Sequence, residues 1–137
     1  MRFFKQNVWA LTLAICGVTA LSTPAVAAED LGNGWGPSPL EIAQLPPYCH
    51  EQFINKDTGA IYKHFSGCSG IHHMCPGLVL INRSANPAIP RAERQRILRQ
   101  SKNEIAYVST RLTPSCTAAP AIQAAEARIR VMETLLK

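Results

Sequence analysis

The chain has 137 residues, of which 47% are hydrophobic, and its 14 Lys and Arg residues against 9 Asp and Glu residues give a net charge of +5 at pH 7. Two of the basic residues, Arg2 and Lys5, lie in an N-terminal segment that we expect to be removed, which leaves 12 basic and 9 acidic residues and a net charge of about +3. This balance excludes the strongly basic class of nucleic-acid-binding proteins, so we expect no nucleic-acid partner.

Residues 1–28 have the three-part pattern of a secretory signal peptide. Arg2 and Lys5 supply positive charge, residues 8–21 form an apolar core, and the small residues Ala25-Val26-Ala27 form a cleavage site. Glycine and polar residues interrupt the core before it reaches the length of about 20 apolar residues that a membrane span needs. We therefore expect a cleaved signal, a periplasmic location and no stable membrane span after signal removal.

The segment after the signal, residues 29–37, is a glycine-rich leader without hydrophobic periodicity, and residues 38–137 are expected to form a single helical domain. Ser38 can cap a helix, and Glu41 three residues later completes a capping box. These residues predict a short helix that ends near Pro46-Pro47, because proline cannot continue a helix.

Turn-forming residues dominate residues 55–70, although Ala60-Ile61-Tyr62 is expected to pair briefly as a strand. A helix is expected from His72, with Ser69 as its candidate cap. Pro76 inside this run lacks the amide that would bond to the carbonyl of His72, which predicts either a kink or a true helix start at the proline.

The apolar helix that follows Pro76 is expected to end at Arg83, and residues 84–90 are expected to form a loop. Residues 91–112 then carry the clearest helical pattern. Apolar or small residues recur there at steps of three and four, namely Ile97, Leu98, Ser101, Ile105, Val108 and Leu112. A second stripe follows in residues 118–137, namely Ile122, Ala125, Ile129, Met132 and Leu136. Because neither stripe can be buried alone, we expect an antiparallel helix pair.

Four cysteines remain after signal removal: Cys49, Cys68, Cys75 and Cys116. An even number in an exported chain of about 110 residues predicts two disulfides. Cys49 can bond to Cys75 and Cys68 to Cys116, but four cysteines allow three pairings, and the sequence does not choose among them.

Cysteine and histidine also cluster in SGCSGIHHMCPGL, residues 66–78. On a helix, Cys68, His72 and Cys75 share one face, and thiolates and imidazoles are ligands of zinc and copper. The alternative metal ligands are Cys49, His50, Cys68, His72, His73 and Cys75. The cluster lacks a paired CxxC, an HExxH and a CxxCH motif, which favours disulfides and hydrogen-bonded histidines over a metal site.

The run from Cys68 to Cys75 also resembles the cysteine-flanked His-Asp helix of secreted phospholipases A2, which implies hydrolysis with His72 as a base. In that family an acid and calcium activate water. Here His73 stands at the position of the acid, and no glycine-rich calcium loop with an aspartate precedes the run. We therefore expect no catalytic residue in this chain.

Three motifs resemble those of a group of small exported proteobacterial proteins of unknown function. They are LPPYC at residues 45–49, HHMCPGL at residues 72–78 followed by Asn82-Arg83, and EIAYV at residues 104–108. In that group the middle motif has the form His-His-x-Cys-x-Gly-Leu, and the helices that follow are similar to tetratricopeptide units. The resemblance implies a helical scaffold without catalytic residues.

The sequence thus predicts a small, disulfide-tied, all-α domain with a tetratricopeptide-like antiparallel helix pair. Its predicted function is that of a non-enzymatic periplasmic interaction or accessory protein, which presents a helical surface to another envelope protein and needs no cofactor. The alternatives are a periplasmic zinc or copper protein that uses the cysteine and histidine cluster, and a secreted hydrolase.

Overall fold

The computed structural model describes residues 36–137, and every regular element in this range is helical. The α-helices are α1 (Pro39–Ala43), α2 (His50–Ile54), α3 (Met74–Ala85), α4 (Arg91–Ser109) and α5 (Ala119–Leu135). The 3-10 helices are η1 (Pro47–Cys49), η2 (Ala60–Lys63) and η3 (Ile71–His73). The predicted all-α fold class is confirmed. The predictions for the signal peptide, and for the leader up to residue 35, lie outside the described residues.

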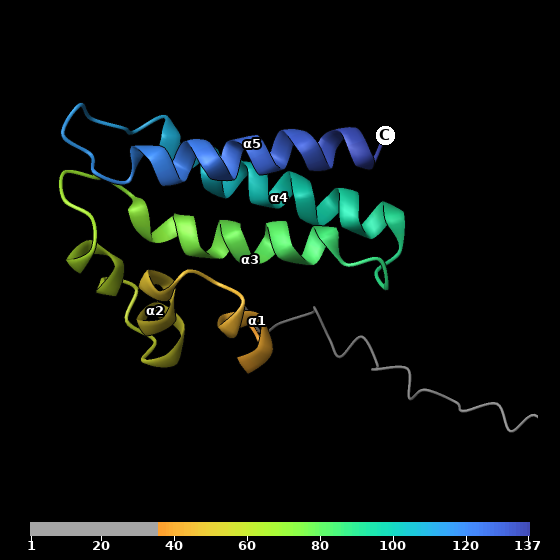
Figure 1. The fold of residues 1–137 in the computed structure, drawn as a ribbon, viewed down its shortest axis with the longest axis horizontal. Helices are drawn as coiled ribbons and strands as arrows, with labels where there is room; N and C mark the ends of the chain where they lie inside the picture. The colour runs from red at the N-terminus through yellow and green to blue at the C-terminus, as the bar shows by residue number, and fades with distance from the viewer. Residues whose placement is uncertain (1–35) are drawn as a thin grey trace, which may run out of the picture. The chain divides into compact units, whose positions relative to one another are not determined.

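The three long helices lie side by side as an antiparallel bundle (Figure 1). α4 is antiparallel to both α3 and α5. Ser101 in the middle of α4 donates to the carbonyl of Gly77 near the start of α3 at 3.0 Å. Gln95 near the start of α4 donates to the carbonyl of Leu136, just after the end of α5, at 2.6 Å. The predicted pair of α4 and α5 is therefore present, with α3 as a third member. Its likeness to tetratricopeptide units stays a prediction.

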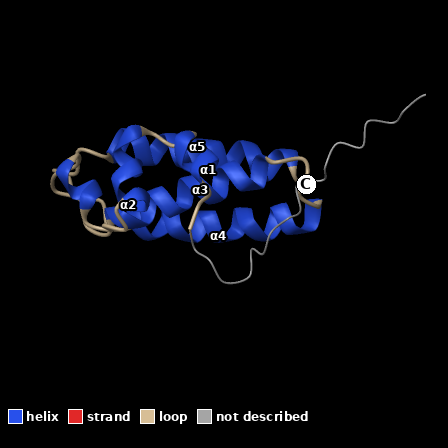
Figure 2. Cartoon of the chain, turned by 90° about the horizontal axis from the view of Figure 1, so that it is seen from below, coloured by secondary structure: helices blue, strands red, loops and turns tan. Residues whose placement is uncertain are grey.

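Figure 1 shows α1 and α2 on the side of α3 that faces away from α5, and Figure 2 views the molecule from that side. α3 is consequently buried on most of its circumference. Its buried residues are Met74, Cys75, Gly77, Leu78, Val79, Leu80, Ile81 and Ser84. A Cβ atom at Gly77 would lie 2.6 Å from Cδ1 of Ile105, so this glycine allows α3 and α4 to approach closely.

The two predicted apolar stripes form the other walls of the core. The buried residues of α4 are Ile97, Leu98, Ser101, Ile105 and Val108. The buried residues of α5 are Ile122, Ala125 and Ile129, and Leu136 follows them. Leu112 and Met132 are partly buried against the same core. The stripes read from the sequence are therefore confirmed.

The predicted capping box at the start of α1 is also confirmed. The Ser38 hydroxyl accepts from the amide of Glu41 at 3.3 Å, and the Glu41 carboxylate accepts from the amide of Ser38 at 2.8 Å. Arg83 of α3 pairs with the same carboxylate, with Nη2 3.1 Å from Oε2. The Arg83 hydrogen bond is the main cause that lowers the pKa of Glu41 from 4.5 to about 2. One carboxylate thus caps α1 and ties it to α3.

The predicted strand at Ala60-Ile61-Tyr62 is wrong, since these residues form η2. Local bonds close the chain there: the Asp57 carboxylate accepts from the amide of Gly59 at 2.9 Å, and the Asp57 carbonyl accepts from the amide of Ala60 at 3.1 Å. Ala60 and Ile61 are fully buried. The described residues contain no strand with which this segment could pair.

The start of α3 differs by two residues from the predicted start at Pro76. η3 leads directly into Met74, so the proline falls in the first turn, where an amide has no helical acceptor and no kink is required. Gly70, not Ser69, precedes η3. α3 also extends beyond Arg83 to Ala85, which shortens the predicted loop to residues 86–90. α4 likewise ends at Ser109, earlier than the predicted residue 112.

Two disulfides, Cys49–Cys75 and Cys68–Cys116, use all four cysteines of the described residues. The first joins η1 to α3, and the second joins the turn before η3 to the connection between α4 and α5. Both are consistent with an oxidising location outside the cytoplasm. None of the described helices has the length and apolar character needed to cross a membrane.

Candidate functional site

Four aromatic and imidazole rings follow one another across three elements. We call them the ring cluster: Tyr62 of η2, His72 and His73 of η3, and Tyr107 of α4. The ring centroids are 6.3 Å apart for Tyr62 and His72, 4.4 Å for the two histidines, and 4.1 Å for His73 and Tyr107. The ring cluster contains both histidines that the sequence singled out as candidates.

The local backbone explains why the rings meet. Gly70 has a φ of +70°, a conformation that L-residues with a side chain rarely adopt, and it turns the chain into η3. A Cβ atom at Gly70 would lie 2.7 Å from Cε1 of Tyr107, so the backbone passes directly against that ring. Disulfides fasten the chain on both sides, at Cys68 and Cys75. The position of the cluster is therefore set by a glycine turn between two cross-links.

Hydrogen bonds orient the two imidazoles. Nδ1 of His73 donates to the Glu104 carboxylate at 2.6 Å, and Nδ1 of His72 is hydrogen-bonded to the Tyr62 hydroxyl at 3.2 Å. The largely buried Gln52 side chain donates to the carbonyl of His72 at 2.8 Å. Each ring is thus held by a partner from another element, as in the predicted packed and hydrogen-bonded histidines.

Partial burial is the main cause that lowers the pKa of His72 below its ordinary value of 6.5. The charge of the neighbouring His73 acts in the same direction, and the Glu104 carboxylate opposes it. The lowered pKa favours the uncharged imidazole of His72, which can act as a hydrogen-bonding group.

A cation extends the ring cluster at its Tyr107 end. The guanidinium carbon of Arg111 lies 3.6 Å from the centroid of the Tyr107 ring, and Nη1 donates to the Tyr107 carbonyl at 2.9 Å. Tyr62 and Tyr107 stay 44% and 39% exposed. The cluster therefore offers two tyrosines and an arginine to solvent, in an arrangement that is already ordered.

The structure does not assemble the alternative metal ligands taken from the sequence. Cys68 and Cys75 are in different disulfides, so neither presents a thiolate. His50 is engaged elsewhere, with Nε2 3.0 Å from the carbonyl of Leu45. Within residues 36–137, no group of three or more His, Cys, Asp or Glu side chains is placed to hold a metal ion.

The acid that the sequence does not reveal next to the histidines is Glu104. It comes from α4, 31 residues after His73, and its side chain is 21% exposed. The pair could orient a base, but neither imidazole is hydrogen-bonded to a Ser, Thr or Cys side chain among the described residues. Its only sequence signal was its place in the EIAYV motif, next to the core residue Ile105.

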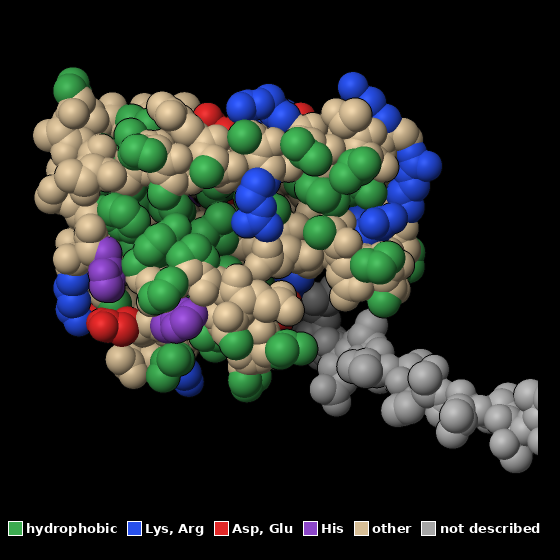
Figure 3. Space-filling view, in the orientation of Figure 1, with side chains coloured by type: hydrophobic (Ala, Val, Ile, Leu, Met, Phe, Trp, Pro, Cys, Tyr) green, Lys and Arg blue, Asp and Glu red, His purple; other side chains and the backbone are tan. Residues whose placement is uncertain are grey.

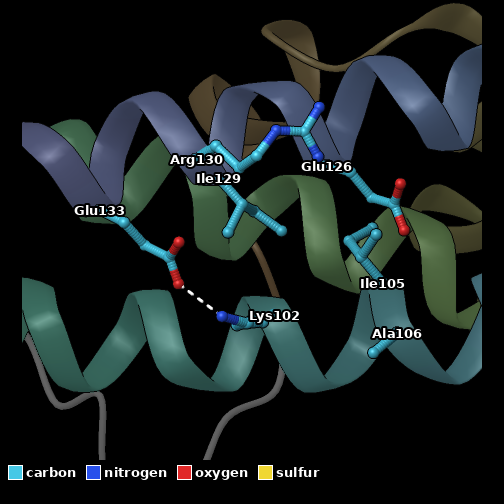
Figure 4. A pocket seen from close by; sticks show the side chains of 7 residues that line it. All are labelled: Lys102, Ile105, Ala106, Glu126, Ile129, Arg130 and Glu133. Atoms are coloured by element: carbon cyan, nitrogen blue, oxygen red, sulfur yellow. Dashed lines mark hydrogen bonds and ion pairs between the residues drawn. The ribbon is translucent and has the colours of Figure 1, made fainter.

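A separate shallow groove of about 380 Å³ runs between α4 and α5 (Figure 4). Its lining residues are Lys102, Ile105, Ala106, Glu126, Ile129, Arg130 and Glu133. Lys102 and Glu133 bridge the groove with an ion pair of 2.6 Å. It contains no histidine or cysteine, and the charged side chains at its rim offset one another. The groove is therefore a weaker candidate site than the ring cluster.

No protein-family model matches the chain, and neither the curated proteins nor the solved structures contain a match to it. The resemblance to small exported proteobacterial proteins therefore stays a prediction from short motifs.

Proposed function

We propose that this protein is a non-enzymatic interaction protein of the periplasm, which presents the ring cluster on a disulfide-tied helical scaffold to another envelope protein. The ring cluster is the observation that carries the proposal. Tyrosine and arginine are enriched among the residues that dominate binding energy at protein interfaces, and here Tyr62, Tyr107 and Arg111 are exposed together.

Preorganisation supports the same function. Binding costs less free energy when the contacting side chains are already ordered. The imidazoles between the two tyrosines are held by Glu104 and Tyr62, and Arg111 is stacked on Tyr107. A partner would therefore meet a surface that requires little rearrangement.

The metal alternative has less support, because its thiolate ligands would have to come from Cys49, Cys68 and Cys75, and all three are in disulfides. Thiol titration and elemental analysis of the exported protein separate the two roles. The interaction role predicts no free thiol and no stoichiometric metal. Thiols that react only after chelation would favour the metal role.

Site-specific photo-crosslinking in living cells tests the interaction role. A photoreactive phenylalanine analogue is placed at Tyr62, at Tyr107, or at Ile54, which is 65% exposed and lies outside the ring cluster. We expect the same adduct from the first two positions and none from Ile54. Arg111→Ala should lower the adduct yield at Tyr62 about tenfold, the effect of losing a dominant interface residue. Adducts that are absent, or equal at all three positions, would contradict the proposal.

A further inference from the structure

α5 carries a second apolar stripe, opposite the one that it buries in the core. Its residues recur at steps of four and three, and all are exposed: Pro120, Ala124, Ala127, Val131 and Leu135. Val131 and Leu135, the two largest, are 59% and 69% exposed. We call these five residues the outer stripe of α5. A helix that is apolar on its solvent side as well indicates a surface with an external partner.

Basic side chains lie along both edges of the outer stripe. At 3.6 residues per turn, Arg128 falls on one edge and Arg130 on the other, and both are exposed; Nη2 of Arg128 also donates to Oδ1 of Asn82 on α3 at 2.6 Å. The two carboxylates of α5, Glu126 and Glu133, point toward α4 instead, whereas the guanidinium of Arg130 turns away from α4 (Figure 4). The outward side of α5 therefore combines an apolar centre with cationic edges and carries no carboxylate.

We propose that the outer stripe of α5 and its two arginines bind the surface of an anionic membrane. Arginine stems can cover apolar surface while their guanidinium groups reach lipid phosphates. Val131 and Leu135 then enter the boundary between head groups and acyl chains, and the helix lies in the plane of the membrane. Figure 3 shows hydrophobic side chains along α5, with Lys and Arg side chains among them and at the end of the bundle where the helix ends.

Charge and shape favour a lipid surface over the other possible occupants. A second copy of the chain, paired through the same face, would bring the arginines of two symmetric stripes close to one another. A partner helix packs into a groove, but the groove beside α5 is lined by none of the outer-stripe residues. A lipid surface offers phosphates that can accept hydrogen bonds from the arginines, and it can adapt to a convex helix that has no groove.

Sedimentation with phosphatidylcholine vesicles, with and without phosphatidylglycerol, tests this proposal on the exported protein. We expect binding to the phosphatidylglycerol vesicles that weakens as salt is added. Arg128→Gln and Arg130→Gln should each lower the partition coefficient about fivefold, the usual effect of one basic residue near an anionic surface. Lys56→Gln/Lys63→Gln is the charge-matched control for the double variant Arg128→Gln/Arg130→Gln. It removes two exposed cations that lie outside α5, so it should bind more tightly than the double arginine variant.

The apolar part of the surface has its own matched pair of variants. Leu135→Ala should lower vesicle binding severalfold, and Ile54→Ala, which truncates a similarly exposed side chain on α2, should not. All variants share the same residues 1–35, so their differences report on α5. Equal binding by all variants would overturn the proposal, as would binding that ignores phosphatidylglycerol. A dimer in analytical ultracentrifugation that Leu135→Ala dissociates would also overturn it, because a second copy would then cover the stripe.

Discussion

At Gly70 the backbone itself contacts the ring cluster, because the chain passes directly against the Tyr107 ring. Its positive φ is one that alanine adopts only at a cost, and a Cβ atom there would press on the Tyr107 ring. Neither constraint is visible in the sequence, where Gly70 reads only as one of several turn residues. A glycine is required at this position because Tyr107 of α4 lies against it in the folded protein.

Gly70→Ala should therefore lower the free energy of unfolding by about 1–3 kcal/mol, from backbone strain and overpacking together. It should also reduce crosslinking from Tyr107, because the ring has to move. Gly36→Ala is the control: Gly36 is exposed, and a Cβ atom there would meet no other part of the chain within 4 Å, so the unfolding free energy should change by less than about 0.5 kcal/mol. Urea denaturation measures both variants. Equal stability of the two would contradict the close contact between Gly70 and Tyr107.

The histidines show what residue patterns could and could not reveal. The prediction that His72 and His73 are packed and hydrogen-bonded agrees with their contacts, since both have partners on other elements. The partners themselves, Tyr62 and Glu104, could not be assigned, because they come from η2 and α4, and only the folded chain brings them to η3. The sequence likewise gave no sign that the Tyr107 ring lies 4.1 Å from the His73 ring, because Tyr107 comes from α4.

Among the elements, hydrophobic periodicity predicted α4 and α5, which each have one buried face. It did not give the limits of α3, which is buried on nearly all sides. α4 and α5 each bury a single stripe, and their residues recur at helical steps. α3 is covered by α4, α5 and the short helices, so its apolar residues run continuously and its limits could not be read from a pattern. η2 was missed for another reason: it is a single short turn held by backbone bonds such as Tyr62 to Gly59, and it is too short to show a hydrophobic period.

The contact between α1 and α3 gives a prediction about pH. The hydrogen bond from Arg83 is the largest of the effects that lower the pKa of Glu41 from 4.5 to about 2 in the folded protein, and the hydrogen bonds from Ser38 act in the same direction. The folded state thus favours the ionised carboxylate, so its stabilisation is complete above pH 4.5 and is lost as the pH falls from about 4.5 to 2. Allowing for the partial exposure of the pair, this stabilisation amounts to about 2 kcal/mol.

A double-mutant cycle of Glu41→Gln and Arg83→Gln measures this contact directly. Unfolding free energies in urea should give a coupling of about 1–2 kcal/mol at pH 7, and the coupling should approach zero near pH 2. The cycle cancels the general loss of stability in acid, because all four proteins share it. A coupling that is absent at pH 7, or unchanged at pH 2, would show that the ion pair does not hold α1 on α3.

At the scale of the whole molecule, the two disulfides stabilise different parts of the fold. Cys49–Cys75 fixes the short helices to α3, and Cys68–Cys116 fixes the turn before η3 to the connection between α4 and α5. Of the ring cluster, His72 and His73 lie between Cys68 and Cys75 in the chain, so each disulfide fastens one side of this pair. Sequence could predict two bonds but not their partners, because each pairing follows from how distant segments pack.

Replacing each pair by alanine should lower the free energy of unfolding by an amount that rises slowly, with the logarithm of the length of the loop that the disulfide closes. The sequence separations are 26 residues for Cys49–Cys75 and 48 residues for Cys68–Cys116, which correspond to losses of about 3.5 and about 4 kcal/mol through the entropy of the unfolded chain. Urea denaturation of Cys49→Ala/Cys75→Ala and Cys68→Ala/Cys116→Ala measures both losses, with reduced wild-type protein as the reference for losing both bonds together. Titration of the native exported protein should find no free thiol. Reactive thiols in that material, or double variants as stable as the wild type, would contradict a scaffold held by these cross-links, because the sulfurs would then be free for other chemistry beside the histidines.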